Sequence, residues 1–276
     1  MNSSVRVPVV AGLFYPDTPE SIHHTLDKLF QSVEIESLPD RPVLGAVVPH
    51  AGWRYSGSVA AYSYFALRER QPERVIIIGP SHREIFNGAT IYDGPAFRTP
   101  LGEIPVDREF IAGLAPTEPL RLNSEGHTRE HAIEVQLPFL QHMYSDEFRI
   151  VPVSMGTDDE KTVNALADLL VEHWTDDQVI IASSDLSHYH RYEKAVAMDT
   201  RFHHFLERGD LEGMRKARDQ SKIEACGFGP VQTLMKISEQ SGWSQFRVLH
   251  YANSGDITGD RSRVVGYLAA AVYGNG

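Results

Sequence analysis

The 276-residue sequence contains a single cysteine, Cys226, and no apolar run of the roughly 18 residues that a membrane-spanning helix requires. One cysteine excludes an internal disulfide and any metal site built from several thiolates. The first residues lack the apolar core of a secretory signal peptide. These three absences predict a protein that neither spans nor contacts a membrane and that works in the cytoplasm.

Positive charge is also scarce, because the 37 Asp and Glu residues outnumber the 26 Lys and Arg residues and give a formal net charge of -11. Proteins that bind nucleic acid usually carry a basic patch, so a nucleic-acid partner is not expected. No apolar run is followed by a glycine-rich phosphate-binding motif. Ser183-Ser184 lacks the flanking glycines of a serine-hydrolase nucleophile, which argues against that class of enzyme.

Short apolar runs that are rich in β-branched residues alternate with segments of helical periodicity, which predicts an α/β fold. Hydrophobic residues make up 42% of the chain, enough for a sizeable core. No linker is long enough to divide it, so residues 1–276 are expected to form one domain with a mixed, largely parallel sheet and helices on both faces. The predicted strands are Val43–Val48, Arg74–Ile78, Phe148–Val153, Val179–Ala182, Phe246–Tyr251 and Val264–Tyr273. The predicted helices cover about 18–30, 107–114, 130–144, 159–173, 194–208, 210–218 and 230–238, and a further helix is predicted to begin at Ser58.

Polar side chains follow four of these strands directly. His50 comes after Val48 and Pro49, and His82 comes after a second buried strand and Pro80. A third strand end carries Asp185 and His188, and a fourth carries Asn253 and Asp256. Ligands of open α/β sheets usually bind at the carboxyl ends of the strands, so we expect these residues to share one pocket.

The residue types at these strand ends are those of a metal site. Neutral imidazoles suit iron, zinc or copper, and two of them with one anionic ligand leave positions open for substrate. The anionic ligand could be the Cys226 thiolate or a carboxylate of Asp185, Glu130 or Glu134, and a remaining histidine could move a proton. Each residue alone has a structural explanation: a hydrogen-bonded histidine, a small buried thiol, an aspartate cap or a solvated helix face. The repeated strand-end histidines favour the site.

Six segments in order along the chain resemble the Memo family, whose prokaryotic members are also called AmmeMemoRadiSam system protein B. They are Arg6–Pro16, Pro49–Gly57, Ile78–His82, Glu130–Glu134 with Leu137-Pro138, Ser183–His188 and Ala225–Gly227. The resemblance implies a fold similar to that of the class III extradiol ring-cleaving dioxygenases. It also implies an iron or copper site formed by His50, His82 and Cys226, with Asp185 and His188 in the same pocket.

The implied ligand set departs from that of the dioxygenases, which use two histidines and a glutamate. A thiolate is softer than a carboxylate and favours copper or a redox role, so ring cleavage does not follow from the fold. The first hypothesis is therefore an iron- or copper-dependent oxidoreductase in which His188 moves a proton and Asp185 orients it or a ligand. The residues expected around the metal are Glu130, His131, Glu134, Asn253 and Asp256.

Two other classes of function remain open from the sequence. One is a binding module for a small molecule or peptide, with aromatic contacts from Trp53, Tyr55, Tyr189 and Tyr251 at the pocket mouth. The other is a zinc-dependent hydrolase, because histidine ligands with an open position also suit water activation. The sequence identifies neither the substrate nor the native metal, and it leaves homo-oligomer formation open.

Overall fold

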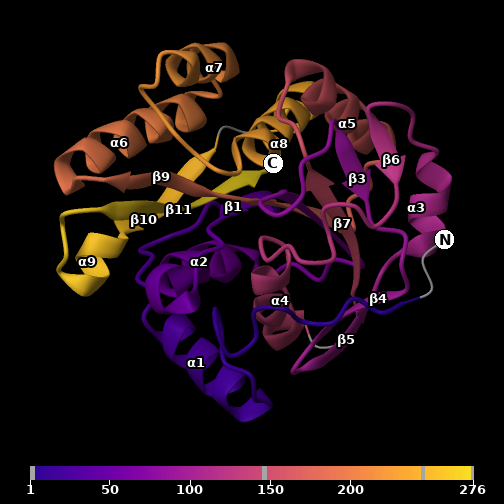
Figure 1. Ribbon diagram of the computed structural model, residues 1–276, viewed down its shortest axis with the longest axis horizontal. Helices are drawn as coiled ribbons and strands as arrows, with labels where there is room; N and C mark the ends of the chain where they lie inside the picture. The colour runs from indigo at the N-terminus through magenta and orange to yellow at the C-terminus, as the bar shows by residue number, and fades with distance from the viewer. Residues whose placement is uncertain (1–3, 145–147, 244–245, 275–276) are drawn as a thin grey trace.

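The computed structural model describes residues 4–144, 148–243 and 246–274. Its centre is a nine-stranded mixed sheet in the order β10-β11-β1-β8-β2-β7-β3-β6, with β9 paired to β11 (Figure 1). The strands of this sheet are β1 Val43–Val48, β2 Arg74–Pro80, β3 Ala89–Ile91, β6 Leu120–Leu122, β7 Arg149–Met155, β8 Gln178–Ser183, β9 Asp185–His190, β10 Arg247–Asn253 and β11 Val264–Tyr273. A separate hairpin is formed by β4 Ala96–Thr99 and β5 Gly102–Pro105.

The helices lie on both faces of this sheet. Helices α1, α2 and α4 cover one face, while α5 and α8 cover the other, with α6 and α7 beside them (Figure 1). Their bounds are α1 Pro19–Gln31, α2 Trp53–Leu67, α3 Arg108–Leu114, α4 Leu137–Tyr144, α5 Glu160–Glu172, α6 Tyr192–Arg208, α7 Leu211–Asp219, α8 Phe228–Ser241 and α9 Ser254–Thr258, with a 3-10 turn at Glu134–Gln136. Among the described residues, no helix combines the length and apolar character needed to cross a membrane.

Four adjacent strands, β1, β8, β2 and β7, run parallel to one another in the middle of the sheet. Every residue of β1 and β8 is buried, as is every residue of β2 and β7 after the first. This burial on both faces explains the nearly continuous Val and Ile runs, because strands covered by helices on each side have no solvent face. The predicted α/β fold with a largely parallel central sheet is confirmed.

Three local predictions were wrong. The segment predicted as a helix from Glu130 is a series of turns, and α4 begins only at Leu137, where Pro138 falls in the first turn. Helix α2 begins at Trp53 rather than Ser58. The polar run after β8 is itself a strand, β9, because it pairs antiparallel with the first part of β11. That pairing is long-range, and the polar composition of the run gave no sign of it.

Candidate metal centre

Three candidate residues follow neighbouring parallel strands. His50 lies just beyond β1, Asp185 begins β9 directly after β8, and His82 lies just beyond β2. The strand order β1-β8-β2 places these three ends side by side at the carboxyl edge of the sheet. Residues far apart in the sequence therefore meet at one point, as expected for an open α/β sheet.

Two turns pack against this edge of the sheet, one that carries His131 and one that carries Cys226. Each packs closely because a glycine at the contact has no side chain. A Cβ on Gly79 would lie 3.1 Å from the Cβ of Ala132, so the glycine lets the turn that carries His131 pack against β2. A Cβ on Gly227 would lie 2.2 Å from the carbonyl oxygen of Ser183, so the turn before α8 packs on the end of β8. The second turn carries Cys226, which donates its N–H to the Asp185 carbonyl at 3.2 Å.

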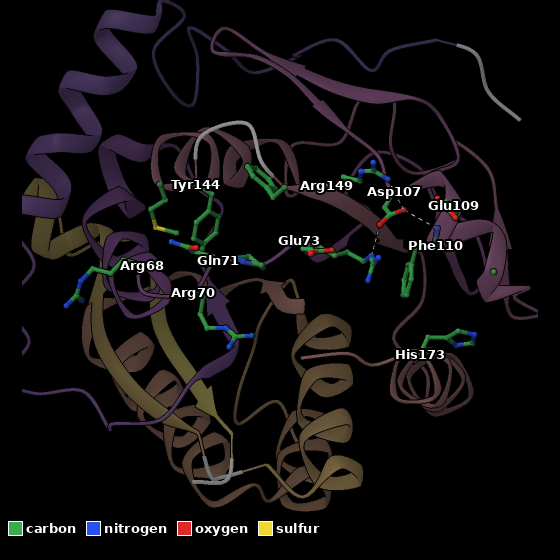
Figure 2. Close-up of a pocket in the computed structure, with 15 residues that line it drawn as sticks. Arg68, Arg70, Gln71, Glu73, Asp107, Glu109, Phe110, Tyr144, Arg149 and His173 are labelled. Atoms are coloured by element: carbon green, nitrogen blue, oxygen red, sulfur yellow. Dashed lines mark hydrogen bonds and ion pairs between the residues drawn. The ribbon is translucent and has the colours of Figure 1, made fainter. Parts of the chain in front are cut away.

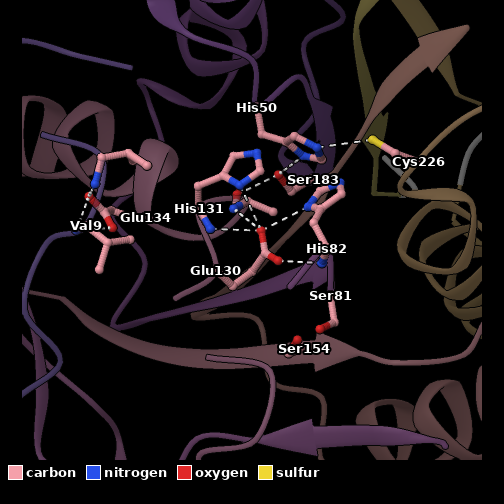
Figure 3. Close-up of polar contacts among 12 residues, drawn as sticks. Val9, His50, Ser81, His82, Glu130, His131, Glu134, Ser154, Ser183 and Cys226 are labelled. Atoms are coloured by element: carbon pink, nitrogen blue, oxygen red, sulfur yellow. Dashed lines mark hydrogen bonds and ion pairs between the residues drawn. The ribbon is translucent and has the colours of Figure 1, made fainter. Parts of the chain in front are cut away.

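An oxygen atom lies close to Nδ1 of each of three imidazoles, and hydrogen bonds hold two of these rings, those of His50 and His82. Nδ1 of His50 lies 2.9 Å from Oγ of Ser183. Oε1 of Glu130 lies 2.9 Å from Nδ1 of His82 and 3.1 Å from Nδ1 of His131 (Figure 3). The hydrogen bond to Glu130 leaves Nε2 of His82 directed away from the carboxylate. A carboxylate behind a histidine is the usual support of a metal ligand, because it fixes the ring and the tautomer.

The donor atoms form two groups that share His50. In one, the donors of His50, His82 and His131 all lie within 4.8 Å of one another; in the other, those of His50, Asp185 and Cys226 do. Nε2 of His50 lies 3.1 Å from Sγ of Cys226. Among the described residues, the predicted combination of His50, His82 and Cys226 does not form such a group, because His82 and Cys226 belong to different ones.

The electrostatics of the first group suit a cation. Burial, reinforced by the neighbouring rings of His82 and His131, lowers the pKa of His50 well below its ordinary value, so the ring is neutral and able to donate a lone pair. Burial alone would raise the pKa of Glu130. Hydrogen bonds from His131 and His82 outweigh that effect and hold the pKa well below its ordinary value, so Glu130 is an anion.

Asp185 and Cys226 lie on the other side of His50. Oδ1 of Asp185 accepts the backbone N–H groups of His50 at 2.8 Å and Ala51 at 3.3 Å, which ties β9 to the end of β1. Burial raises the pKa of Asp185, and burial together with the Asp185 carboxyl raises the pKa of the Cys226 thiol. Cys226 is therefore protonated until a cation displaces the proton, as metal binding to thiols requires.

Five residues predicted around the pocket have other environments. Trp53 is 6% exposed and packs in the core against Tyr15 and Phe139. The remaining four take part in three structural hydrogen-bond arrangements. Glu134 binds the N-terminal segment, Tyr251 donates to Asp199 at 2.8 Å, and Asn253 with Asp256 forms the capping box of α9.

The other predicted residues lie at the rim. His188 is half-buried on β9 and is close enough to His50 and Asp185 to contribute to their pKa shifts. Tyr55 is 36% exposed and Tyr189 is 62% exposed. Tyr189 has a φ of 61°, a left-handed conformation that an aromatic residue rarely adopts, and its ring contacts that of His188. Strain of this kind often accompanies a functional site.

A cavity of about 400 Å³ adjoins Cys226 between the end of β2, the loop that joins β7 to α5, and the start of α8. Its walls include Ser81, Met155 and Pro230. A larger groove of about 1040 Å³ lies at the opposite edge of the sheet, where Arg74 and Arg149 begin β2 and β7 (Figure 2). The substrate-sized space that reaches the candidate metal centre is therefore the smaller cavity.

Two supporting residues were not predicted. Ser183 holds Nδ1 of His50 and donates to the carbonyl of Ala132 at 2.8 Å. Gln136 donates to the Pro49 carbonyl at 3.0 Å and to Ser183 at 2.9 Å. Ser183 could have been found from its place at the end of a buried strand beside Asp185. Nothing in the sequence distinguished Gln136 from an ordinary helix residue.

The fold and this edge define a class of protein: an α/β protein with three histidines, a cysteine and carboxylates gathered at the carboxyl ends of parallel strands. Residues 6–271 match the family model described as Memo-like protein. A MEMO1 family protein of Methanosarcina mazei is 40% identical, over 97% of this chain and 99% of its own. One of Sulfolobus acidocaldarius is 36% identical, over 96% and 98%. The chain belongs to the Memo family.

A solved structure gives independent support for the fold. An uncharacterized protein from Escherichia coli K12 superposes with a TM-score of 0.55 over 84% of this chain and all of its own. The two sequences are 12% identical, so the similarity concerns the fold alone.

Proposed function

We propose that this protein is a metal-dependent oxidoreductase or redox protein, with iron or copper bound at the carboxyl edge of the sheet. His50 and His82 would hold the ion, and Cys226 would supply a thiolate from the side of the small cavity. The observation that carries the proposal is the support of the two imidazoles: Ser183 lies behind His50, and Glu130 lies behind His82, each at 2.9 Å. Histidines that bind a metal usually have such a group at the other ring nitrogen, because it fixes the orientation of the ring.

The donor types favour a redox metal. Nitrogen donors with a thiolate suit copper and iron, whereas carboxylates and carbonyls suit magnesium or calcium. When bound, such an ion would supply one-electron chemistry at the site. The chain itself would orient a substrate in the cavity of about 400 Å³ and limit the access of water.

Proton movement is assigned to His188, with Asp185 as its partner. His188 is half-buried on β9, and an imidazole can both accept and donate a proton through its ring nitrogens. Asp185 is held by the backbone N–H groups of His50 and Ala51, so its carboxyl group stays in place beside the ligands. We propose that His188 takes or gives the proton of the substrate at the rim and that Asp185 orients His188 or a ligand.

Metal analysis tests the proposal directly. Protein purified without a histidine tag, and then reconstituted with Fe(II) or Cu, is expected to hold one ion per chain. The double variant His50→Ala with His82→Ala should lose that ion, whereas His24→Ala on α1 should keep it. Equal metal content in the double variant and the parent would refute the proposal.

The ligand set also allows a zinc-dependent hydrolase, because the three imidazoles of His50, His82 and His131 are a donor set that zinc uses in catalytic sites. This alternative predicts tight zinc and no change on oxidation or reduction. A binding module for a small molecule or peptide predicts metal without oxygen uptake or redox change across a broad substrate panel. An anaerobic reconstitution followed by an oxygen-electrode trace separates the three.

A further inference from the structure

His131 lies where a third ligand of the ion would lie. The group of donor atoms that contains both His50 and His82 also contains His131, with all three donors within 4.8 Å of one another. We infer that Nε2 of His131 is a metal ligand in addition to His50 and His82, and that Glu130 positions His82 and His131 together. This inference rests on the proposed function and concerns the same site.

The spacing of the three rings fits a common ion. The ring centroids are 5.1 Å apart for His50 and His82, 5.5 Å for His50 and His131, and 4.8 Å for His82 and His131. Three imidazole nitrogens that each lie about 2 Å from one ion at tetrahedral angles place their ring centres about 5 Å apart. The three side chains therefore need little movement to share an ion.

Glu130 gives the second reason to treat the two rings as a pair. Its Oε1 lies 2.9 Å from Nδ1 of His82 and 3.1 Å from Nδ1 of His131, and it also accepts the N–H of Ala132 at 3.0 Å (Figure 3). The carboxylate is 3% exposed. A buried anion beside two imidazoles balances part of the charge of a cation that both rings could bind.

A purely structural role for His131 explains less. Its ring packs edge-on against Phe14, which a leucine or phenylalanine could do equally well. That contact accounts for a bulky side chain but not for an imidazole whose Nδ1 faces a buried carboxylate. Cys226 lies on the side of His50 away from His131 in Figure 3, so the thiol and the third imidazole do not compete for one position.

The experiment measures Co(II) and Cu(II) affinity by competition with a chromophoric chelator, together with the absorption spectrum of each loaded protein. His131→Gln is expected to weaken binding about 100-fold, and Glu130→Gln about 10- to 100-fold. His127→Gln is the matched control, because His127 is a buried histidine of the same segment outside the donor groups, and it should bind as the parent does. Circular dichroism establishes that each variant is folded.

A measurement on the unaltered protein keeps the inference testable if a variant does not fold. Pulsed electron paramagnetic resonance of the Cu(II) protein with ¹⁵N-labelled histidine counts the coordinated imidazoles, and three are expected. A count of two, or parent-like affinity of a folded His131→Gln variant, would overturn the inference and leave the proposed function standing. Failure of the parent to bind either ion would instead remove the proposed function.

Discussion

The N-terminal segment is anchored by one buried carboxylate, and its removal should be costly. Glu134 has no exposed surface and accepts hydrogen bonds from the N–H of Val9 at 2.9 Å, the N–H of Val10 at 3.0 Å and the hydroxyl of Tyr15 at 2.8 Å. It also forms an ion pair with Arg6, whose side chain is 3% exposed. Glu134→Gln leaves the Arg6 guanidinium without its charge partner. It also replaces one accepting oxygen by an NH₂ group, which cannot accept the hydrogen bonds that Val9, Val10 and Tyr15 donate.

Breaking a buried ion pair from one side destabilises a protein by about 3–5 kcal/mol, and we expect a loss of that size for Glu134→Gln. Urea unfolding followed by tryptophan fluorescence measures it, because Trp53 packs directly on Tyr15. Metal content should not change. A loss below about 1 kcal/mol would show that this anchor is not energetically important and would refute the reasoning.

Three further predictions concern separate parts of the molecule. Burial lowers the pKa of His127 to about 3, so below about pH 6.5 the unfolded state binds a proton that the folded state does not. The free energy of unfolding is therefore expected to fall by about 1.4 kcal/mol per pH unit as the pH drops from 6.5 toward 3. His127→Gln should therefore flatten the acid limb of the stability curve, measured by urea unfolding at pH 4.5 and 7. Asn253→Ala removes the capping box of α9 and should cost about 1 kcal/mol in thermal unfolding without lowering metal content. Gly227→Ala places a Cβ 2.2 Å from the Ser183 carbonyl oxygen, so the turn that carries Cys226 should be displaced. The rate at which an alkylating reagent modifies Cys226 should then change. A rate equal to that of the parent would contradict this prediction.

Much of the fold follows from patterns that are local in the sequence. The apolar β-branched runs at β1, β2 and β8 identify buried strands, and the aspartates before α3 and α5 cap those helices through their side chains. β9 could not be predicted in this way, because its residues are polar and its pairing partner, β11, follows about 75 residues later. Strands of that kind are defined by their neighbours rather than by their composition.

The candidate site could likewise be predicted only in part from local sequence patterns. Strand-end position was enough to bring His50, His82 and Asp185 together, because parallel neighbours end at one edge. The same criterion failed for Asn253 and Asp256, because these residues also follow a strand but form the cap of a short helix. The proximity of His131 to His50 depends on a turn that packs over Gly79, and no local pattern encodes that distance.

The last strand, β11, has a consequence for how the protein acquires its site during synthesis. It pairs with β1, β9 and β10 at once, so β1 has an open edge until β11 is in place. During synthesis, β11 leaves the ribosome only after every other strand of the sheet. Until then the free edge of β1 can pair with strands of other chains. His50 follows β1 directly, and β9 carries Asp185 and His188. Completion of the sheet therefore also fixes β9 and the end of β1, so partly synthesised chains lack the finished candidate site.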